Sequence, residues 1–315
     1  MAILGRHAVL ALAALTAGCD LTRGPTPLEL TGETVSVHSV LRARSDTVAV
    51  WLTRVLYGTG EDDLALEPIS GAQVRIAGPG GSVSLAEVSG AVWPCGPLYW
   101  GGSQLNDQPG AGCYGAIFPG GIATGARYEL LIVLPSGDTI RGATVVPEAP
   151  VLLAPANHLR IEVPAWSSSS SPAEKLEVRW RLDPEARSVR PGPGLVAERV
   201  FERGAVQAGV FCQLVAWPDG DPVGSTEVRV DLEIYSANCY RPPTETSPPA
   251  AIDWDSIHVM LRVPACDTAC ARYQEQVANQ RYAPEDRASA GLTGAYGLFG
   301  GLALAERSLV LVRKR

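Results

Sequence analysis

The sequence predicts a mainly β protein with two β-sandwich-like domains, of immunoglobulin- or transthyretin-like type, and a short helix near the C-terminal end. Two observations predict this class. Several stretches alternate apolar and polar residues, which places one face of a strand on a core and the other in water. Between them lie turn clusters, drawn from the 33 glycines and 25 prolines of the 315-residue chain, and these residues favour turns.

The clearest strands are three alternating stretches. Their inward sets are Val48, Val50 and Leu52; Val178, Trp180 and Leu182; and Val228, Val230, Leu232 and Ile234. The segment Tyr128–Leu134 is apolar on both faces, and the turn at 135–138 leads from it into Thr139–Val146. This pattern predicts a β-hairpin whose first strand is central and covered.

One helix is predicted over residues 267–281, because Asp267 is a good N-cap residue and follows Pro264 closely. Prolines at 147, 150 and 155 predict a domain boundary near 147–157. We therefore expect an N-terminal β-sandwich at 34–148 and a C-terminal β-rich domain at 158–315.

The first 33 residues resemble the start of a bacterial lipoprotein. Arg6 and an apolar run precede the segment Leu15-Thr16-Ala17-Gly18-Cys19, so residues 1–18 are predicted to be a signal peptide and Cys19 the lipidated residue. Residues 19–33 then form a tether rich in Pro, Gly and Thr. We expect a lipid-anchored protein of the cell envelope, with the outer membrane favoured over the inner. The alternative is an ordinary signal peptide, with Cys19 in a disulfide.

Six further cysteines predict disulfides, because an even number in an exported chain is typical of them. They are Cys95, Cys113, Cys212, Cys239, Cys266 and Cys270. If neighbouring cysteines pair, Cys95–Cys113 would close a glycine-rich loop and Cys212–Cys239 would tie two strands together. A bond between Cys266 and Cys270 would bridge the start of the helix. Fifteen connectivities are open. No metal site is predicted, since no second Cys or His pair has zinc-site spacing.

Four aromatic residues flank the loop between the first two of these cysteines: Trp93, Tyr99, Trp100 and Tyr114. Aromatic side chains on a loop fixed by a disulfide suit a platform for a sugar or peptide. The alternative is a small core beneath a long loop.

The net charge of −7 gives no argument for nucleic acid, whose ligands carry basic stripes, and no motif predicts a cofactor. Asp253, Asp255 and His258 lie within six residues and could bind a cation or act as paired carboxylates. The alternative is a solvated loop entering a strand. Alternation along 34–41 places His38 on a solvated face.

Six short motifs follow one another along the chain: the strand Thr34–Leu41, Ser70–Ile76, Gly125–Leu130, Thr144–Pro147, Ile257–Val263 with Tyr273, and Gly297–Gly301. Their order resembles the bacterial lipoprotein family called domain of unknown function 4249. The resemblance implies an envelope lipoprotein that works alongside outer-membrane transport systems. It carries over no catalytic residues.

Two functions follow as expectations. The first is a non-catalytic, membrane-anchored binding or accessory module with an envelope or outer-membrane protein as partner. The second is a glycan- or peptide-acting hydrolase that uses Asp253 and Asp255.

Overall fold

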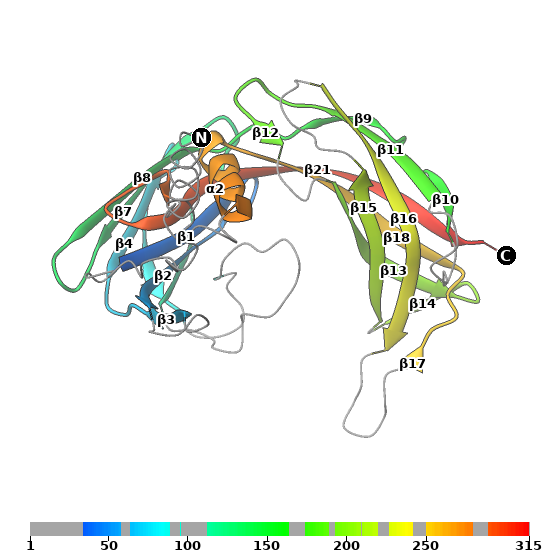
Figure 1. The fold of residues 1–315 in the computed structure, drawn as a ribbon, viewed down its shortest axis with the longest axis horizontal. Coiled ribbons are helices and arrows are strands. Elements are labelled where there is room, and N and C mark those ends of the chain that lie inside the picture. The colour runs from blue at the N-terminus through cyan, green and yellow to red at the C-terminus, as the bar shows by residue number, and fades with distance from the viewer. Residues whose placement is uncertain are drawn as a thin grey trace, which may run out of the picture. The chain divides into compact units, whose positions relative to one another are not determined.

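The structure is a computed structural model. It describes residues 34–57, 64–88, 95, 112–163, 174–188, 193–208, 210–219, 227–241, 250–279 and 289–314. Residues 34–315 form one compact unit. Within the described ranges the chain is mainly β with one helix, α2 (Figure 1), which confirms the expected fold class.

The larger sheet has 16 strands among the described residues. Its main path is β14-β13-β18-β21-β1-β2-β6-β5-β4-β7-β8-β20, and β3, β10, β12 and β19 pair beside it. In chain order the bounds are β1 Thr34–Arg42, β2 Thr47–Tyr57, β3 Leu64–Pro68, β4 Gln73–Gly78, β5 Gly81–Glu87, β6 Cys113–Ile117, β7 Arg127–Val133, β8 Thr139–Val145, β10 Arg160–Val163, β12 Arg187–Ser188, β13 Gly194–Glu202, β14 Ala205–Gln207, β18 Ser256–Cys266, β19 Ser289–Ala290, β20 Leu292–Thr293 and β21 Tyr296–Arg313.

The smaller sheet has the order β15-β16-β11-β9, with β17 paired to β16. Its bounds are β9 Val151–Ala154, β11 Glu174–Arg181, β15 Phe211–Asp219, β16 Glu227–Arg241 and β17 Ala250–Ala251. The alternation expected along β11 and β16 is present, since Val178 and Trp180 on one strand and Val230 and Leu232 on the other are buried. The predicted hairpin is also present as β7 and β8, which pair antiparallel around the turn at 135–138.

A first core gathers buried side chains of β1, β2, β4, β5, β6, β7, β8 and β21 and of the loops next to them. It consists of Val37, Leu41, Val48, Val50, Leu52, Ile69, Val74, Ile76, Leu85, Tyr114, Phe118, Ile122, Tyr128, Leu130, Ile132, Ile140, Val146 and Phe299. Two tyrosines stand out in it because their hydroxyl groups are buried. Each hydroxyl bonds to loop backbone, so the first core fixes its loops from inside.

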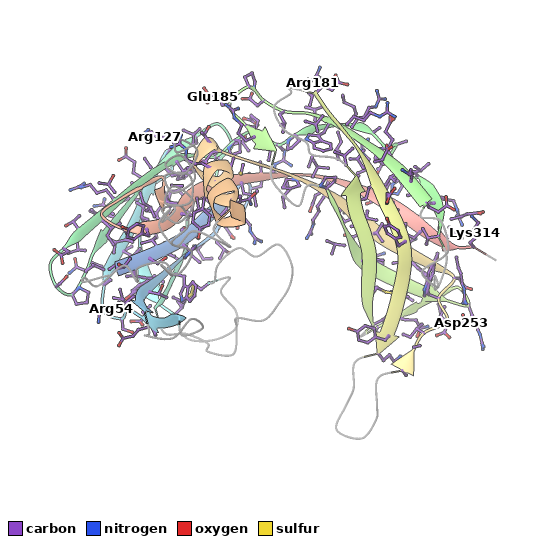
Figure 2. All side chains as sticks on the ribbon, in the orientation of Figure 1. Arg54, Arg127, Arg181, Glu185, Asp253 and Lys314 are labelled. Carbon is purple, nitrogen blue, oxygen red and sulfur yellow. A yellow bond between two sulfur atoms is a disulfide. The ribbon has the colours of Figure 1, made fainter. Side chains whose placement is uncertain are left out.

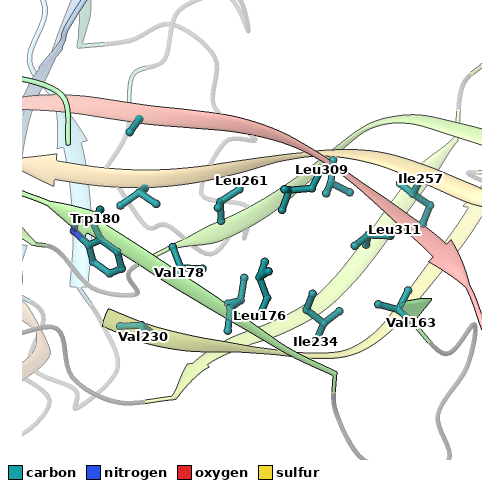
Figure 3. Close-up of a cluster of buried hydrophobic side chains, with 14 of the residues drawn as sticks. Val163, Leu176, Val178, Trp180, Val230, Ile234, Ile257, Leu261, Leu309 and Leu311 are labelled. Carbon is teal, nitrogen blue, oxygen red and sulfur yellow. The ribbon is translucent and has the colours of Figure 1, made fainter. Parts of the chain in front are cut away.

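A second core lies between the smaller sheet and strands β13, β18 and β21 (Figure 3). Leu176, Val178 and Trp180 come from one side, and Ile257, Leu261, Leu309 and Leu311 come from the other. Side chains of two sheets thus fill one layer, as in a β-sandwich.

Strand β21 contributes to both cores. Its beginning pairs in parallel with β1, with Val37 opposite Gly297, and its end pairs with β10. Phe299 belongs to the first core, whereas Leu309 belongs to the second. Gly297 has φ +102°, and a Cβ there would collide with the backbone oxygen of Val37. Glycine is therefore required where β21 meets β1.

Helix α2 (Thr268–Asn279) begins where the sequence predicts it. The Asp267 carboxylate accepts a hydrogen bond from the Cys270 amide at 2.8 Å, which is the contact of an N-cap. The helix lies beside β1 (Figure 1), and a small apolar cluster joins Cys270 to Leu298 and Leu302 of β21.

This helix overturns the expected environment of His38. The imidazole is not on a solvated face but lies between Trp51 and Tyr273, with ring centroids at 6.0 and 5.7 Å. Alternation along β1 indicated only that His38 and Val37 face opposite sides. It carried no sign that α2, more than 200 residues later in the chain, covers the second side.

Strand β7 departs from expectation in a similar way. It is central, between β4 and β8, but only one of its faces is covered. Tyr128, Leu130 and Ile132 are buried, whereas Arg127 and Glu129 are exposed. Among the described residues, the outer face of β7 is therefore exposed to solvent at Arg127 and Glu129 and half-buried at Leu131.

Candidate functional site

The carboxylates expected to act together have separate partners. Asp253 pairs with Arg313, and Asp255 accepts a hydrogen bond from the Gly204 amide at 3.2 Å. The His258 ring packs against Phe201, with centroids 4.8 Å apart. Asp253 lies at the surface (Figure 2), and its side chain is 74% exposed. This arrangement adds no argument for the hydrolase, which stays a prediction. The described residues contain no cluster of three metal-ligating side chains.

Two of the three expected disulfides are present. Cys95 is joined to Cys113, and Cys212 is joined to Cys239. The second bond links directly opposed residues of the paired strands β15 and β16, with 4.0 Å between their Cα atoms. The first fastens residue 95 to the start of β6 at the edge of the first core.

The third expected disulfide, between Cys266 and Cys270, is absent, and both are free buried thiols. The expectation assumed that both residues lie on the first turn of a helix. Cys266 is instead the last residue of β18, one position before the N-cap, so it has extended backbone. The two thiols are in contact, and burial raises the pKa of the Cys266 thiol.

The expected aromatic platform is corrected at Tyr114. This side chain is 1% exposed, and its hydroxyl group donates to the Ile69 carbonyl at 2.9 Å and accepts from the Ala72 amide at 3.0 Å. It is a core residue, which the alternative of a small core beneath the loop describes better. Trp93, Tyr99 and Trp100 lie outside the described residues, as does Cys19.

The structure instead reveals a pocket of about 700 Å³ on the outer face of β4, β7, β8 and β20, beside α2. We call it the arginine pocket, because it is lined by Arg75, Arg127, Arg141 and Arg272. Glu129 is the one acidic residue among its described lining residues. The side chain of Arg127 is labelled in Figure 2, beside β7 and β8.

The strand register sets the positions of these arginines. Arg75 of β4 and Arg141 of β8 both pair with Leu131 of β7, so the two arginines flank one apolar residue in a single row. Strands lie about 4.8 Å apart, which places the two Cα atoms roughly 10 Å from each other. Thr293 of β20 continues the row beyond Arg141.

The next row of the same face consists of small residues, apart from Glu129. Ala77 and Ala143 pair with Glu129 on either side, and Gly291 bonds to the Ala143 amide. Gly291 has φ +72°, and a Cβ there would collide with the Phe299 carbonyl. Short side chains form the floor and long arginines form the walls, which explains why this face is hollow.

The guanidinium groups differ in their partners. Arg75 donates to the Ser82 hydroxyl at 2.6 Å, and Arg127 pairs with Glu129 at 3.3 Å. Arg141 and Arg272 are exposed and make no hydrogen bond or ion pair within the described part of the chain. The pocket therefore presents two guanidinium groups with unused donors.

The sequence alone did not indicate this pocket. Its residues are spread from position 75 to position 293, and each arginine sits at an ordinary polar position of a strand or helix. The pairing of β4 with β7, across about 50 residues, brings them together. An excess of arginine on the outward positions of 73–77 and 127–145 was the one signal available.

No protein-family model and no curated protein sequence matches this chain. Within the described residues, no helix is long and apolar enough to cross a membrane.

Proposed function

We propose that this protein is a non-catalytic binding or accessory module of the bacterial cell envelope, anchored through lipid on Cys19. A membrane anchor would hold the β-rich body, which begins at Thr34, at the end of the tether at 19–33. The partner proposed is an envelope or outer-membrane protein, as the resemblance to the lipoprotein family 4249 implies. The outer membrane is the proposed location.

The observation that carries the proposal is the pair of disulfides in a β body. Cys95–Cys113 and Cys212–Cys239 are each joined through their sulfur atoms, with Cα atoms 5.7 and 4.0 Å apart, and both separations are below the roughly 7 Å that a disulfide can span. Disulfides persist in exported proteins and are rare in the reducing cytosol. The disulfides therefore support export from the cytosol, as the signal-like N-terminus does, and the two arguments depend on different residues.

Anchoring would follow from several acyl chains on one residue. A single chain gives only marginal membrane binding, whereas two or more give stable attachment. The anchor then needs no membrane-spanning element, and the folded body remains free to bind at a distance set by the tether.

Intact mass spectrometry of the protein extracted from bacterial membranes tests the anchor. We expect a chain beginning at Cys19 with a diacylglyceryl group and an amide-linked acyl chain. Reduction should add about four hydrogen atoms for the two disulfides. The variant Cys19→Ser should lose the acyl mass and leave the membrane fraction, whereas the matched control Cys270→Ser should keep both. An unacylated wild-type chain would overturn the proposal.

A further inference from the structure

We propose that the arginine pocket binds a ligand that carries two phosphate groups. This inference adds a ligand class to the binding role proposed above. Its test does not depend on the lipid anchor, so the failure of either proposal can be distinguished from failure of the other.

The charge of the pocket supports a ligand of this kind. Among the described lining residues, four arginines and one glutamate give a net charge of +3, although the whole chain carries −7. A phosphate monoester carries about −1.5 to −2 at neutral pH. Two phosphate groups therefore match the positive charge of the pocket, whereas one carboxylate would leave most of the pocket's charge uncompensated.

The donor groups also fit phosphate. A guanidinium presents its N–H donors in a planar fork that binds two oxygens of one phosphate at once. Arg141 and Arg272 have their forks unoccupied within the described residues. Arg75 gives up only a neutral hydroxyl partner, Ser82, when it turns toward a ligand. These three arginines come from β4, β8 and α2, so they surround an anion from different sides.

The shape of the pocket leaves room for two phosphates. Its volume of about 700 Å³ is within the range of small-ligand sites. The floor at Ala77, Ala143 and Gly291 lets oxygen atoms approach the sheet. Leu131, between Arg75 and Arg141, offers one apolar contact to the body of the ligand.

Glu129 allows a test of whether the charge of the pocket controls its affinity for an anion. Its carboxylate pairs with Arg127 inside the pocket, so it repels an anion and occupies one guanidinium. Removal of its charge should strengthen binding, whereas removal of an arginine should weaken it. A loss of fold would change both variants in the same direction.

The experiment is calorimetric titration of the full chain, in detergent, with pyrophosphate at 150 mM NaCl. We expect saturable binding to the wild type. The double variant Arg141→Ala/Arg272→Ala should bind about tenfold or more weakly, because two charge-assisted contacts are lost. Glu129→Gln should bind about threefold more tightly. The control Arg160→Ala/Arg181→Ala removes equal charge from exposed positions outside the pocket, and its affinity should change by less than about twofold.

A second titration, with cardiolipin mixed into the detergent, distinguishes two sources of the same chemistry. Weaker apparent binding of pyrophosphate would identify a lipid headgroup with two phosphates, and unchanged binding would identify a soluble ligand. Either result supports the pocket. Absence of saturable binding to the wild type, or an equal loss in the control variant, would overturn the proposal.

Discussion

The outer faces of the two β layers differ in how their charges are arranged. On the smaller sheet, Glu177 accepts from Arg179 at 3.0 Å and from Arg229 at 2.6 Å, and Lys175 pairs with Glu233 at 2.9 Å. We call these residues the charge network. On the outer face of β4, β7 and β8, Arg127 pairs with Glu129, Arg75 bonds to a neutral hydroxyl, and Arg141 makes no ion pair within the described chain.

Strand register explains this difference. In the pairing of β11 with β16, Lys175 lies directly opposite Glu233. Arg179 lies opposite Arg229, and Glu177, two residues away on β11, pairs with both of these arginines. In the other layer, Leu131 separates Arg75 from Arg141. The same alternation of polar and apolar residues thus gives a neutralised surface in one place and a cationic pocket in the other. We infer that ligands bind at the arginine pocket and not at the charge network.

The cores differ as well. The first core depends on special contacts, namely the Tyr114 and Tyr128 hydroxyls and the close approach at Gly297. The second core is mostly aliphatic side chains packed between two sheets. We therefore expect single substitutions to separate the two cores, and the predictions below run from the largest effect to the smallest.

Gly297→Ala should destabilise the protein by roughly 3–5 kcal/mol, because the new Cβ collides with the backbone of Val37 and φ is positive. Hydrogen exchange should show the loss of protection first in β1, β2 and β7. Gly81→Ala is the matched control, since Gly81 has φ +111° with open space around it. Its cost should stay near 1–2 kcal/mol. Equal loss of protection in β11 and β16 would contradict the separation of the cores.

The protein should lose stability in acid through His38, on the side of β1 that α2 covers. Burial lowers the pKa of this imidazole to about 4, below its value of about 6.5 in an unfolded chain. The unfolded state therefore takes up the proton first. The contribution of neutral His38 to the free energy of unfolding is complete above pH 6.5 and falls by up to about 3 kcal/mol as the pH drops to 4.

Urea denaturation of the wild type and His38→Gln between pH 4 and 7 checks this expectation. The variant should show a flatter dependence of the free energy of unfolding on pH. Asp267, whose pKa burial raises, is present in both proteins and so cancels in the difference. Parallel curves would show that His38 does not titrate as expected.

Tyr114→Phe should cost about 1–3 kcal/mol, because the Ile69 carbonyl and the Ala72 amide both lose their partner. Tyr128→Phe is the comparison, since it removes the partner of a single amide, that of Ala123, and should cost less. Thermal unfolding measures both. A larger effect at Tyr128 would show that the loop near Ile69 is not fixed by the hydroxyl.

Glu177→Gln in the charge network should have the smallest effect, about 0.2–1 kcal/mol, because Glu177, Arg179 and Arg229 are each more than a third exposed. The loss should shrink further at 1 M salt. This variant also frees two arginines outside the arginine pocket. If it gained pyrophosphate binding equal to that of the wild-type pocket, charge alone would suffice and the shape argued above would be irrelevant.

Local chemistry in the sequence determined the β class, the alternation of β11 and β16, the β7–β8 hairpin, and the start of α2 at Asp267. Each depends on residues within about 20 positions, where periodicity, turn residues and an N-cap act directly. Pairing of neighbouring cysteines succeeded at Cys95–Cys113 and Cys212–Cys239, which are 18 and 27 positions apart in the chain. It failed at Cys266 and Cys270, because a strand end replaces a helical turn.

Only the tertiary structure decided which strands are neighbours and which faces are covered. The pairing of β4 with β7 and of β1 with β21 joins segments that are far apart in the chain. Long-range packing of this kind also half-buried His38 against α2, buried Tyr114, left one face of β7 exposed, and gathered four arginines around a floor of small residues. Alternation specifies that a residue faces one side of a strand, but long-range packing specifies what lies on that side.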